Sequence, residues 1–352
     1  MTTLAQGVEV HRLAVAGREP EIARDVGNRV ARVWLSTSRF ADVEALATAT
    51  LSLGPDASAF YNLAGAQSFT GQPHHPLENY DKALRLYREA GNRAGEAATL
   101  ASIGHVYSRL GDPQQALAHY HQALPIQRDL GDRANEATTL SSIGRVYNGL
   151  GYQQQALNRY HQALPIQRDL GDRAGEATTL NNIGSAYHGL GDPQQALAHY
   201  HQALPIQREI GNRTGEAAAL TNIGGVYHEL GDLQQALTHY HQALPITRDI
   251  GDRTCEAAAL NNIGGVYRLL GDPQQAISHY RQALPIRQQV GDRAGEAVTR
   301  YNIAMIYRDE GDLDEAIGEL EIVVDLDRQV GHPDLASDTA MLEQLRQERD
   351  RE

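Results

Sequence analysis

The sequence predicts an all-α protein built as a solenoid of helical hairpins. Between regularly spaced glycines, apolar residues recur at intervals of three and four, the spacing of one helix face. A period between about 20 and 50 residues indicates a solenoid, whose units pack only on their neighbours. Two glycine series each recur every 40 residues: Gly91, Gly131, Gly171, Gly211, Gly251 and Gly291, and Gly111, Gly151, Gly191, Gly231, Gly271 and Gly311.

The unit that covers residues 97–136 predicts the first helix of each hairpin, here called helix A. Four residues of this helix share one face: Leu100, Ile103, Gly104 and Tyr107. Gly111 interrupts the pattern and is expected to end the helix.

The second helix, here called helix B, carries its own start signal. Asp112 is expected to be the N-cap, Pro113 the first helical residue, and Gln115 the partner in a capping box. Gly131 ends helix B, so each helix should run about 17 residues, or about 25 Å. The buried face of helix B is predicted to hold Ala116, Tyr120, Ala123 and Gln127.

The repeats divide the chain into four regions. Seven repeats of about 40 residues occupy 57–332: five near-identical units at 97–296, a unit at 57–96 with Pro76 in place of Ala116, and a diverged unit at 297–332. A degenerate helical pair precedes them at 24–56, with Trp34 in place of Tyr107. We expect residues 1–23 to form a tail or the stub of another domain, and residues 333–352 a capping helix and tail.

Composition excludes several classes of function. A formal net charge of −13 argues against a nucleic-acid partner, and no apolar run reaches the roughly 20 residues of a membrane span. The single cysteine, Cys255, excludes an internal disulfide and favours a reducing cytoplasm. One lysine, Lys82, among many arginines favours a bacterial origin.

The repeat resembles the tetratricopeptide repeat. That motif places a large residue, Leu, Gly and Tyr on helix A, and Ala, an aromatic residue and Ala on helix B, as this chain does in each unit. The 40-residue version looks most like the long-repeat subgroup of kinesin light chain, Pins-type polarity adaptors, bacterial peptide-sensing regulators and sensor arrays of bacterial signalling ATPases. The resemblance implies a right-handed superhelix in which helix A lines a concave groove that binds extended peptides or partner segments.

The exterior of helix A varies between copies, whereas that of helix B is nearly constant. We interpret the variation as specialisation of the helix A face for recognition; neutral drift, which should touch both helices, is the alternative. Two equivalent sets on helix A show it: His105, Arg145, Ser185, Gly225, Gly265 and Met305, and Ser108, Asn148, His188, His228, Arg268 and Arg308.

One polar position of helix A is nearly constant. Asparagine offers both a donor and an acceptor to a peptide backbone, and the pattern is similar to the asparagine ladder in the repeat superhelix of O-GlcNAc transferase. The alternative is that the amides bond to the neighbouring helix or to water. The position holds Asn62, Ser102, Ser142, Asn182, Asn222, Asn262 and Asn302, with Asn181 and Asn261 alongside Asn182 and Asn262.

The asparagines would not hold a partner without other contacts. Each net hydrogen bond contributes about 0.5–1.5 kcal/mol, so four supply about 2–6 kcal/mol, and micromolar binding needs about 8 kcal/mol. Because arginine pairs well with carboxylates, an extended protein or peptide segment with acidic residues is the expected partner. The candidate side chains are Arg145, Arg268 and Arg308 for carboxylates, and Leu269, Tyr301 and Met305 as apolar anchors. His188 and His228, at a variable position of helix A, are further candidate binding residues.

The fifteen histidines do not have the spacing of a metal site. His119 and His121 point in directions about 200° apart on a helix, and equivalent histidines of successive units should lie about 8–10 Å apart. We interpret them as a solvated convex face, with pH sensitivity open. We predict no metal or cofactor. The prolines equivalent to Pro125, which recur within helix B, are expected to kink it.

The sequence therefore predicts a non-enzymatic interaction scaffold that binds a protein or peptide in its helix A groove. One alternative is the ligand-sensing array of a bacterial signalling or peptide-pheromone system. Another is an enzyme with a cryptic site in the groove, although no phosphate-binding loop, nucleophile elbow or Ser-His-Asp order occurs. The oligomeric state is left open.

Overall fold

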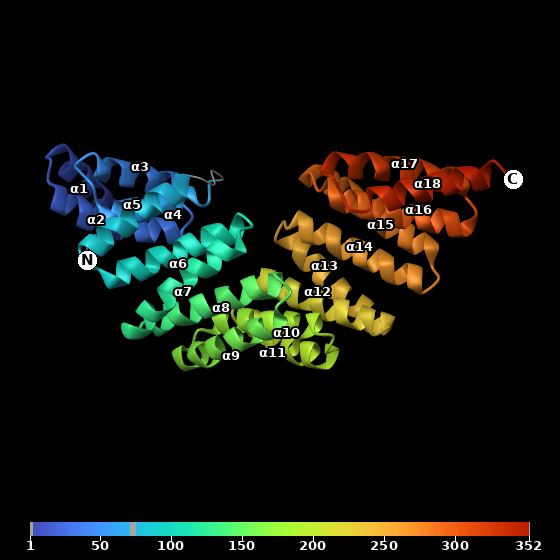
Figure 1. Cartoon of the computed structure of the whole chain (residues 1–352), viewed down its shortest axis with the longest axis horizontal. Helices are drawn as coiled ribbons and strands as arrows, with labels where there is room; N and C mark the ends of the chain where they lie inside the picture. Colours follow the sequence, from blue (N-terminus) through green and yellow to red (C-terminus); the bar gives the residue numbers. More distant parts are fainter. Residues whose placement is uncertain (1–2, 71–74, 352) are drawn as a thin grey trace. The chain divides into compact units, whose positions relative to one another are not determined.

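The computed structural model describes residues 3–70 and 75–351, and these contain eighteen helices and no strand. The chain forms two compact units, named unit 1 (Met1–Gly175) and unit 2 (Glu176–Glu352). Within each unit, helices that follow one another in the sequence pack side by side (Figure 1). The predicted solenoid of helical hairpins is confirmed.

Unit 1 contains three complete hairpins of the repeat array after three preceding helices. Helix A of these hairpins is α4, α6 and α8, and helix B is α5, α7 and α9. The bounds are α1 (Leu4–Ala16), α2 (Pro20–Ser36), α3 (Phe40–Leu51), α4 (Ala57–Gln67), α5 (His75–Glu89), α6 (Arg93–Arg109), α7 (Pro113–Asp129), α8 (Arg133–Gly149) and α9 (Gln153–Leu170).

Unit 2 contains four hairpins and a final helix. Helix A of its hairpins is α10, α12, α14 and α16, and helix B is α11, α13, α15 and α17. The bounds are α10 (Arg173–Gly189), α11 (Pro193–Glu209), α12 (Arg213–Glu229), α13 (Leu233–Asp249), α14 (Arg253–Leu269), α15 (Pro273–Val290), α16 (Arg293–Glu310), α17 (Leu313–Val330) and α18 (Leu335–Arg349).

The helix ends lie where the local sequence predicts them. The Asp112 carboxylate accepts from the Gln115 backbone N–H at 3.0 Å, and Pro113 takes the first helical position of α7. Gly131, with φ of 66°, adopts the left-handed conformation that turns the chain after α7. The proline within α7, Pro125, does not end the helix, which continues to Asp129.

Five of the seven hairpins, α6–α7 to α14–α15, are held together where a glycine of helix A meets a tyrosine of helix B. In the α12–α13 hairpin, a Cβ atom added to Gly224 would lie 2.8 Å from Cδ1 of Tyr240. The Tyr240 side chain is 1% exposed and packs against Leu260 and Ile263 of the next helix A. The tyrosine therefore joins two hairpins, and a side chain larger than hydrogen does not fit opposite it.

Successive hairpins are also joined by a buried glutamate at the start of helix A. Glu256 at the start of α14 is 4% exposed. Its Oε1 accepts from Arg248 Nε at 2.9 Å, and its Oε2 accepts from Arg253. Arg248 lies at the end of α13, so the carboxylate bonds the α12–α13 hairpin to the α14–α15 hairpin. The repeat pattern does not by itself reveal this role of the glutamate.

The regions that flank the repeats are helical. Residues 4–16, expected from the sequence to belong to a tail or stub, form α1, because Thr3 and Gln6 make a reciprocal capping box. At the other end of the sequence, α18 lies in the segment expected to be a capping helix and buries Leu342 and Leu345 against unit 2. The proposed domain boundaries stay predictions.

Candidate peptide-binding surface on helix A

The asparagines of the helix A surface lie beside the core. In α12, Asn222 directly precedes Ile223 and Gly224, which are buried. The start of α12 is held by Asn212, whose side chain accepts from the Gly215 backbone N–H at 3.0 Å. Four equivalent positions on the four A helices of unit 2 are half-buried in the same way: Asn182, Asn222, Asn262 and Asn302.

Three of the candidate asparagines bond between neighbouring A helices. Asn222 Nδ2 on α12 donates to Asn181 Oδ1 on α10 at 3.3 Å. Thr299 Oγ1 on α16 donates to Asn261 Oδ1 on α14 at 3.1 Å. For Asn181, Asn222 and Asn261, the alternative to peptide binding, a bond to the neighbouring helix, is therefore present.

The side-chain amides of the other three asparagines have no hydrogen-bond partner among the described residues and are called open amides. Within the described part of the chain, the side chains of Asn182, Asn262 and Asn302 make no hydrogen bond to another residue. Each half-buried amide offers two N–H donors and a carbonyl acceptor, which water or a bound segment must satisfy. Asn222 also retains its Oδ1 as an acceptor. The three amides lie at equivalent positions of α10, α14 and α16 and are called the amide row.

The charged candidates fall into paired and unpaired groups. His188 Nε2 lies 2.7 Å from Glu229 Oε2, and an Arg308 N–H donates to Asp309 Oδ1 at 2.6 Å. The pairing makes both less available to a carboxylate ligand.

His228 and Arg268 have no carboxylate partner among the described residues. Arg268 is exposed beside Tyr280: burial raises the pKa of Tyr280, and Arg268 opposes that rise. Leu269, next to Arg268, is 55% exposed. The unpaired charge and the open apolar contact therefore occur together at the end of α14.

The prediction that Met305 is an apolar anchor for a ligand is wrong. Its side chain is 5% exposed and packs with Leu342 and Leu345 of α18. This cluster includes residues of α18, which lies outside the repeats, so the repeat pattern could not reveal the burial of Met305. Tyr301 packs against the same cluster but is only partly buried.

Arg145 belongs to unit 1, whereas the other candidates belong to unit 2. It is exposed on α8, near His105 of α6. Burial lowers the pKa of His105, and the charges of Arg145 and Arg109 lower it further. Its role as a binding residue stays a prediction.

The sequence predicts that all the helix B histidines form a solvated face. This prediction is wrong for the set equivalent to His119. These histidines stack on the helix A tyrosine of their own hairpin, with ring planes 3–5° apart and centroids 5.4–5.6 Å apart. The pairs are Tyr107–His119, Tyr187–His199, Tyr227–His239 and Tyr267–His279. The tyrosine and the histidine recur at fixed positions of the repeat, which could have indicated that they form a pair. Their contact nevertheless depends on how helix A and helix B pack, which the sequence does not give. The second set, represented by His121, is exposed.

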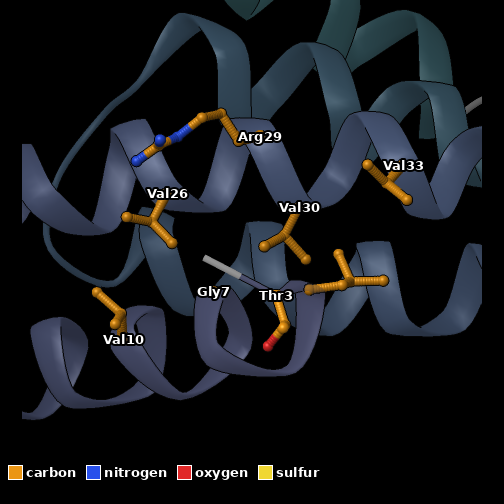
Figure 2. A pocket seen from close by; sticks show the side chains of 8 residues that line it. Thr3, Gly7, Val10, Val26, Arg29, Val30 and Val33 are labelled. Carbon is orange, nitrogen blue, oxygen red and sulfur yellow. The ribbon is translucent and has the colours of Figure 1, made fainter. Parts of the chain in front are cut away.

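An apolar cavity of about 490 Å³ lies between α1 and α2 in unit 1. Figure 2 shows Val10 of α1 and Val26 and Val30 of α2 around it. It is separate from the asparagine row and holds a single charged side chain, Arg29. We assign no ligand to it.

Two kinds of site are absent from the described residues. No group of three or more His, Cys, Asp or Glu side chains in 3–70 and 75–351 is arranged to hold a metal ion. No helix in these ranges has both the length and the apolar character needed to cross a bilayer.

The repeat geometry and the sequence identify the family. A family model described as tetratricopeptide repeat matches six overlapping segments, residues 55–129, 95–169, 135–209, 175–249, 215–289 and 255–329. The chain belongs to the tetratricopeptide repeat family. This fold is generally a non-enzymatic interaction scaffold. No curated protein sequence matches the chain.

Solved tetratricopeptide repeat structures share the fold at low sequence identity. A signal-transduction ATPase with numerous domains and a tetratricopeptide repeat sensor, from Pyrococcus horikoshii, aligns with 91% of this chain at a TM-score of 0.68 and 14% identity. The aligned region is 52% of that protein, so this chain spans about half its length.

Two further structures are similar. A Rap protein complexed with competence and sporulation factor aligns with 93% of this chain and 98% of its own, at a TM-score of 0.62 and 15% identity. BtubC from P. vanneervenii aligns with 60% of this chain and 88% of its own, at a TM-score of 0.55 and 23% identity.

Proposed function

We propose that this tetratricopeptide repeat protein is a non-catalytic scaffold whose helix A surface in unit 2 binds an extended protein or peptide segment. The observation that carries the proposal is the row of open amides at Asn182, Asn262 and Asn302. A half-buried amide that the protein leaves unpaired gains a hydrogen bond when a peptide backbone approaches. A backbone in extended conformation offers a donor and an acceptor at each residue, so it suits a repeated amide.

The side chains beside the row favour a carboxylate on the bound segment. Arg268 and His228 are the cationic candidates of unit 2 that carry no carboxylate partner among the described residues. The exposed Leu269 supplies an apolar contact next to them. We therefore propose an acidic residue followed or preceded by an apolar one in the segment that crosses α14, in a protein that acts in a reducing, cytoplasmic compartment.

The decisive experiment compares a groove variant with a matched control. The groove variant carries Asn182→Ala, Asn262→Ala and Asn302→Ala, which remove amides that bond nothing in the described chain. The control carries Gln202→Ala and Gln242→Ala, which are exposed on helix B. Both should melt as the wild type does, because neither removes a hydrogen bond made within the protein.

Partners captured from native lysate with the wild type are mapped to a minimal peptide, whose dissociation constant is measured by fluorescence anisotropy. Loss of three hydrogen bonds of about 0.5–1.5 kcal/mol each predicts a dissociation constant raised about tenfold or more for the groove variant. The control should bind like the wild type. Equal affinity of all three proteins would show that the segment does not use the amide row.

A second candidate is the sensory array of a bacterial signalling system. It is supported by the similarity of the fold to the repeat sensor of the signal-transduction ATPase and to the Rap protein complex. Under this proposal, mass spectrometry of the captured proteins identifies a signalling enzyme whose activity changes when the groove peptide is added. If the activity of the captured partner does not change when the peptide is added, the result favours a scaffold without a sensory role.

A further inference from the structure

One buried carboxylate in unit 2 departs from the repeat pattern. Asp327 on helix B α17 is 1% exposed, and its Oδ2 has no hydrogen-bond donor among the described residues. The equivalent residue of the preceding hairpin is Arg287, which donates to Asp292 Oδ2 at 2.6 Å. The equivalent positions in earlier hairpins are uncharged: Gln127, Gln167, Gln207 and Thr247.

The residue types of this pair are exchanged in the last hairpin, where an aspartate takes the first position and a histidine the second. Forty residues after Arg287 and Asp292, the chain has Asp327 and His332. The His332 Nδ1 lies 3.9 Å from Asp327 Oδ1, which is too long for a hydrogen bond. A buried carboxylate near the end of a helix is also unfavourable because the helix dipole is negative there. The protein therefore holds a carboxylate that its own groups do not fully compensate.

Asp327 lines a cavity of about 420 Å³ between α16, α17 and α18. Two more carboxyl groups, Asp334 and Asp338, line the same cavity, and no arginine or lysine does. Burial and the adjacent Asp327 carboxylate raise the pKa of Asp338 to about 6, with Asp334 adding to the rise and His332 opposing it. The cavity thus places the buried Asp327 carboxylate near two further carboxyl groups, of which Asp334 is exposed to solvent.

The arginines of these three helices are engaged elsewhere. Arg300, for example, donates to both Glu296 and Glu319. None of the others lines the cavity, and each has its own contact: Arg293 with Gln329, Arg308 with Asp309, Arg328 with Asp325, Arg346 with Glu321, and Arg349 with Asp314 and Asp350. The positive charge that would balance the cavity is therefore not supplied by these side chains.

We propose that this cavity binds the guanidinium group of an arginine side chain from a ligand. Val298, which is 46% exposed, and the half-buried Tyr301 form an apolar and aromatic wall suited to the stem and flat face of arginine. Asp338 and Asp334, which line the same cavity, provide carboxylate oxygens, the acceptors with which arginine pairs well. Asp327 adds the charge of a buried carboxylate that lines the same cavity.

A metal ion is a weaker fit. Metal sites in proteins need several ligands within one coordination shell, and the described residues contain no group of three suitable side chains arranged in that way. The cavity also has an apolar wall that a hydrated metal would not use. The proposal does not depend on the amide row, although both surfaces include α16.

The test uses the full chain and a small probe, N-acetyl-arginine amide, at pH 7.5. Binding is measured by calorimetry and by saturation-transfer NMR. The citrulline analogue has nearly the same shape without the charge, and we expect it to bind at least tenfold more weakly. The lysine analogue tests the planar group: it should bind more weakly than the arginine probe. Equal binding of the arginine and citrulline probes, or binding of neither, would overturn the proposal.

Substitutions of the carboxylates that line the cavity test whether the arginine probe binds there. Asp338→Asn and Asp327→Asn should each weaken binding of the arginine probe at least tenfold. The matched control is Asp325→Asn, an exposed carboxylate on the same helix α17, which should bind as the wild type does. Melting curves verify that each variant is folded. Unchanged binding by a folded Asp338→Asn variant would refute the assignment.

The same experiment separates this inference from the proposed groove. The variant that lacks Asn182, Asn262 and Asn302 should still bind the arginine probe like the wild type. If that variant loses its peptide but keeps the probe, both proposals stand; if it keeps both, only the groove proposal fails. Loss of probe binding in this variant would contradict an independent arginine cavity.

Discussion

The Tyr227 ring lies parallel to the His239 ring, with the planes 5° apart and the centroids 5.6 Å apart. The His239 Nδ1 is buried and has no hydrogen-bond partner among the described residues. Burial lowers the pKa of His239, and His201 and Arg208 lower it further. A histidine held in this way is neutral in the folded protein at pH values where the unfolded chain takes up a proton.

This relationship predicts that acid weakens the fold. The unfolded histidine titrates near its ordinary pKa of about 6.5, whereas the folded pKa is lower. The contribution of His239 is therefore present above about pH 6.5 and is lost as the pH falls toward the folded value. The free energy of unfolding, measured by urea titration between pH 7.5 and 5.5, should fall with pH, and His239→Gln should make the slope shallower.

The control for the pH experiment is His161→Gln, which replaces an exposed histidine of helix B. Asp338, whose pKa is raised to about 6, acts in the opposite direction because its folded state binds the proton more readily. That contribution is the same in all three proteins and cancels in the comparison. Parallel slopes for wild type and His239→Gln would contradict the prediction.

Replacing two adjacent glycines of α12 by alanine should change the stability of the protein in opposite directions. A Cβ on Gly224 would lie 2.8 Å from Tyr240 Cδ1, whereas a Cβ on Gly225 would lie 3.8 Å from the Tyr240 hydroxyl. Overpacking should make Gly224→Ala cost about 1–3 kcal/mol. Gly225→Ala should stabilise by about 0.5–1 kcal/mol through helix propensity. Chemical denaturation measures both, and a stabilising Gly224→Ala would show that the tyrosine moves freely.

Two prolines of α15 offer a similar comparison. Pro285 lies inside the helix and is exposed, so it removes a hydrogen bond to the Arg281 carbonyl without filling the core. Pro285→Ala should stabilise the protein by about 1–3 kcal/mol. Pro273 occupies the first helical position, where proline is favoured, and Pro273→Ala should change stability by less than about 0.5 kcal/mol.

Thermal melting of the two proline variants checks this prediction. A neutral Pro285→Ala would mean that the helix around this residue has adapted to the missing bond. The kink expected at these prolines stays a prediction, which amide exchange around Arg281 would test: the amides that follow a distorted turn exchange faster than those of a regular helix.

Replacing the buried Glu256 should lower the stability of the fold more than replacing an exposed glutamate. Its carboxylate accepts from Arg248 at the end of α13 and from Arg253 at the start of α14. Hydrogen bonds to charged groups contribute about 1.5–3 kcal/mol when buried, but both arginines are about half exposed. We therefore expect Glu256→Ala to cost about 1–3 kcal/mol. Glu310→Ala, at an exposed position, should have little effect; equal effects would refute a joining role.

The helix boundaries were predictable because they depend on neighbouring residues in the chain. Asp112 caps α7 through a bond to a residue three positions away, and Gly131 turns the chain through its own backbone angle. Neither signal needs a distant partner. The repeat makes such local signals stronger, since the same cap occurs once in nearly every hairpin.

The state of the candidate site was not predictable in the same way. Asn222 and Asn262 occupy equivalent positions, yet Asn222 bonds Asn181 and Asn262 bonds no described residue. Met305 has the same place in its repeat as Gly265, but its side chain is buried in a cluster with residues of α17 and α18. These differences arise from the side chain on the next helix, about 40 residues away, so a single unit does not contain the information.

The sequence alone was enough to establish the helices, their order and the repeat, because caps, glycine turns and apolar spacing act over a few residues. It was also enough to name the tetratricopeptide pattern. Packing between helices settled the rest: which amides stay open, that His239 stacks on Tyr227, that Glu256 joins two hairpins, and that Asp327 is buried beside a cavity. These properties depend on groups brought together from separate helices, and only the folded chain brings them together.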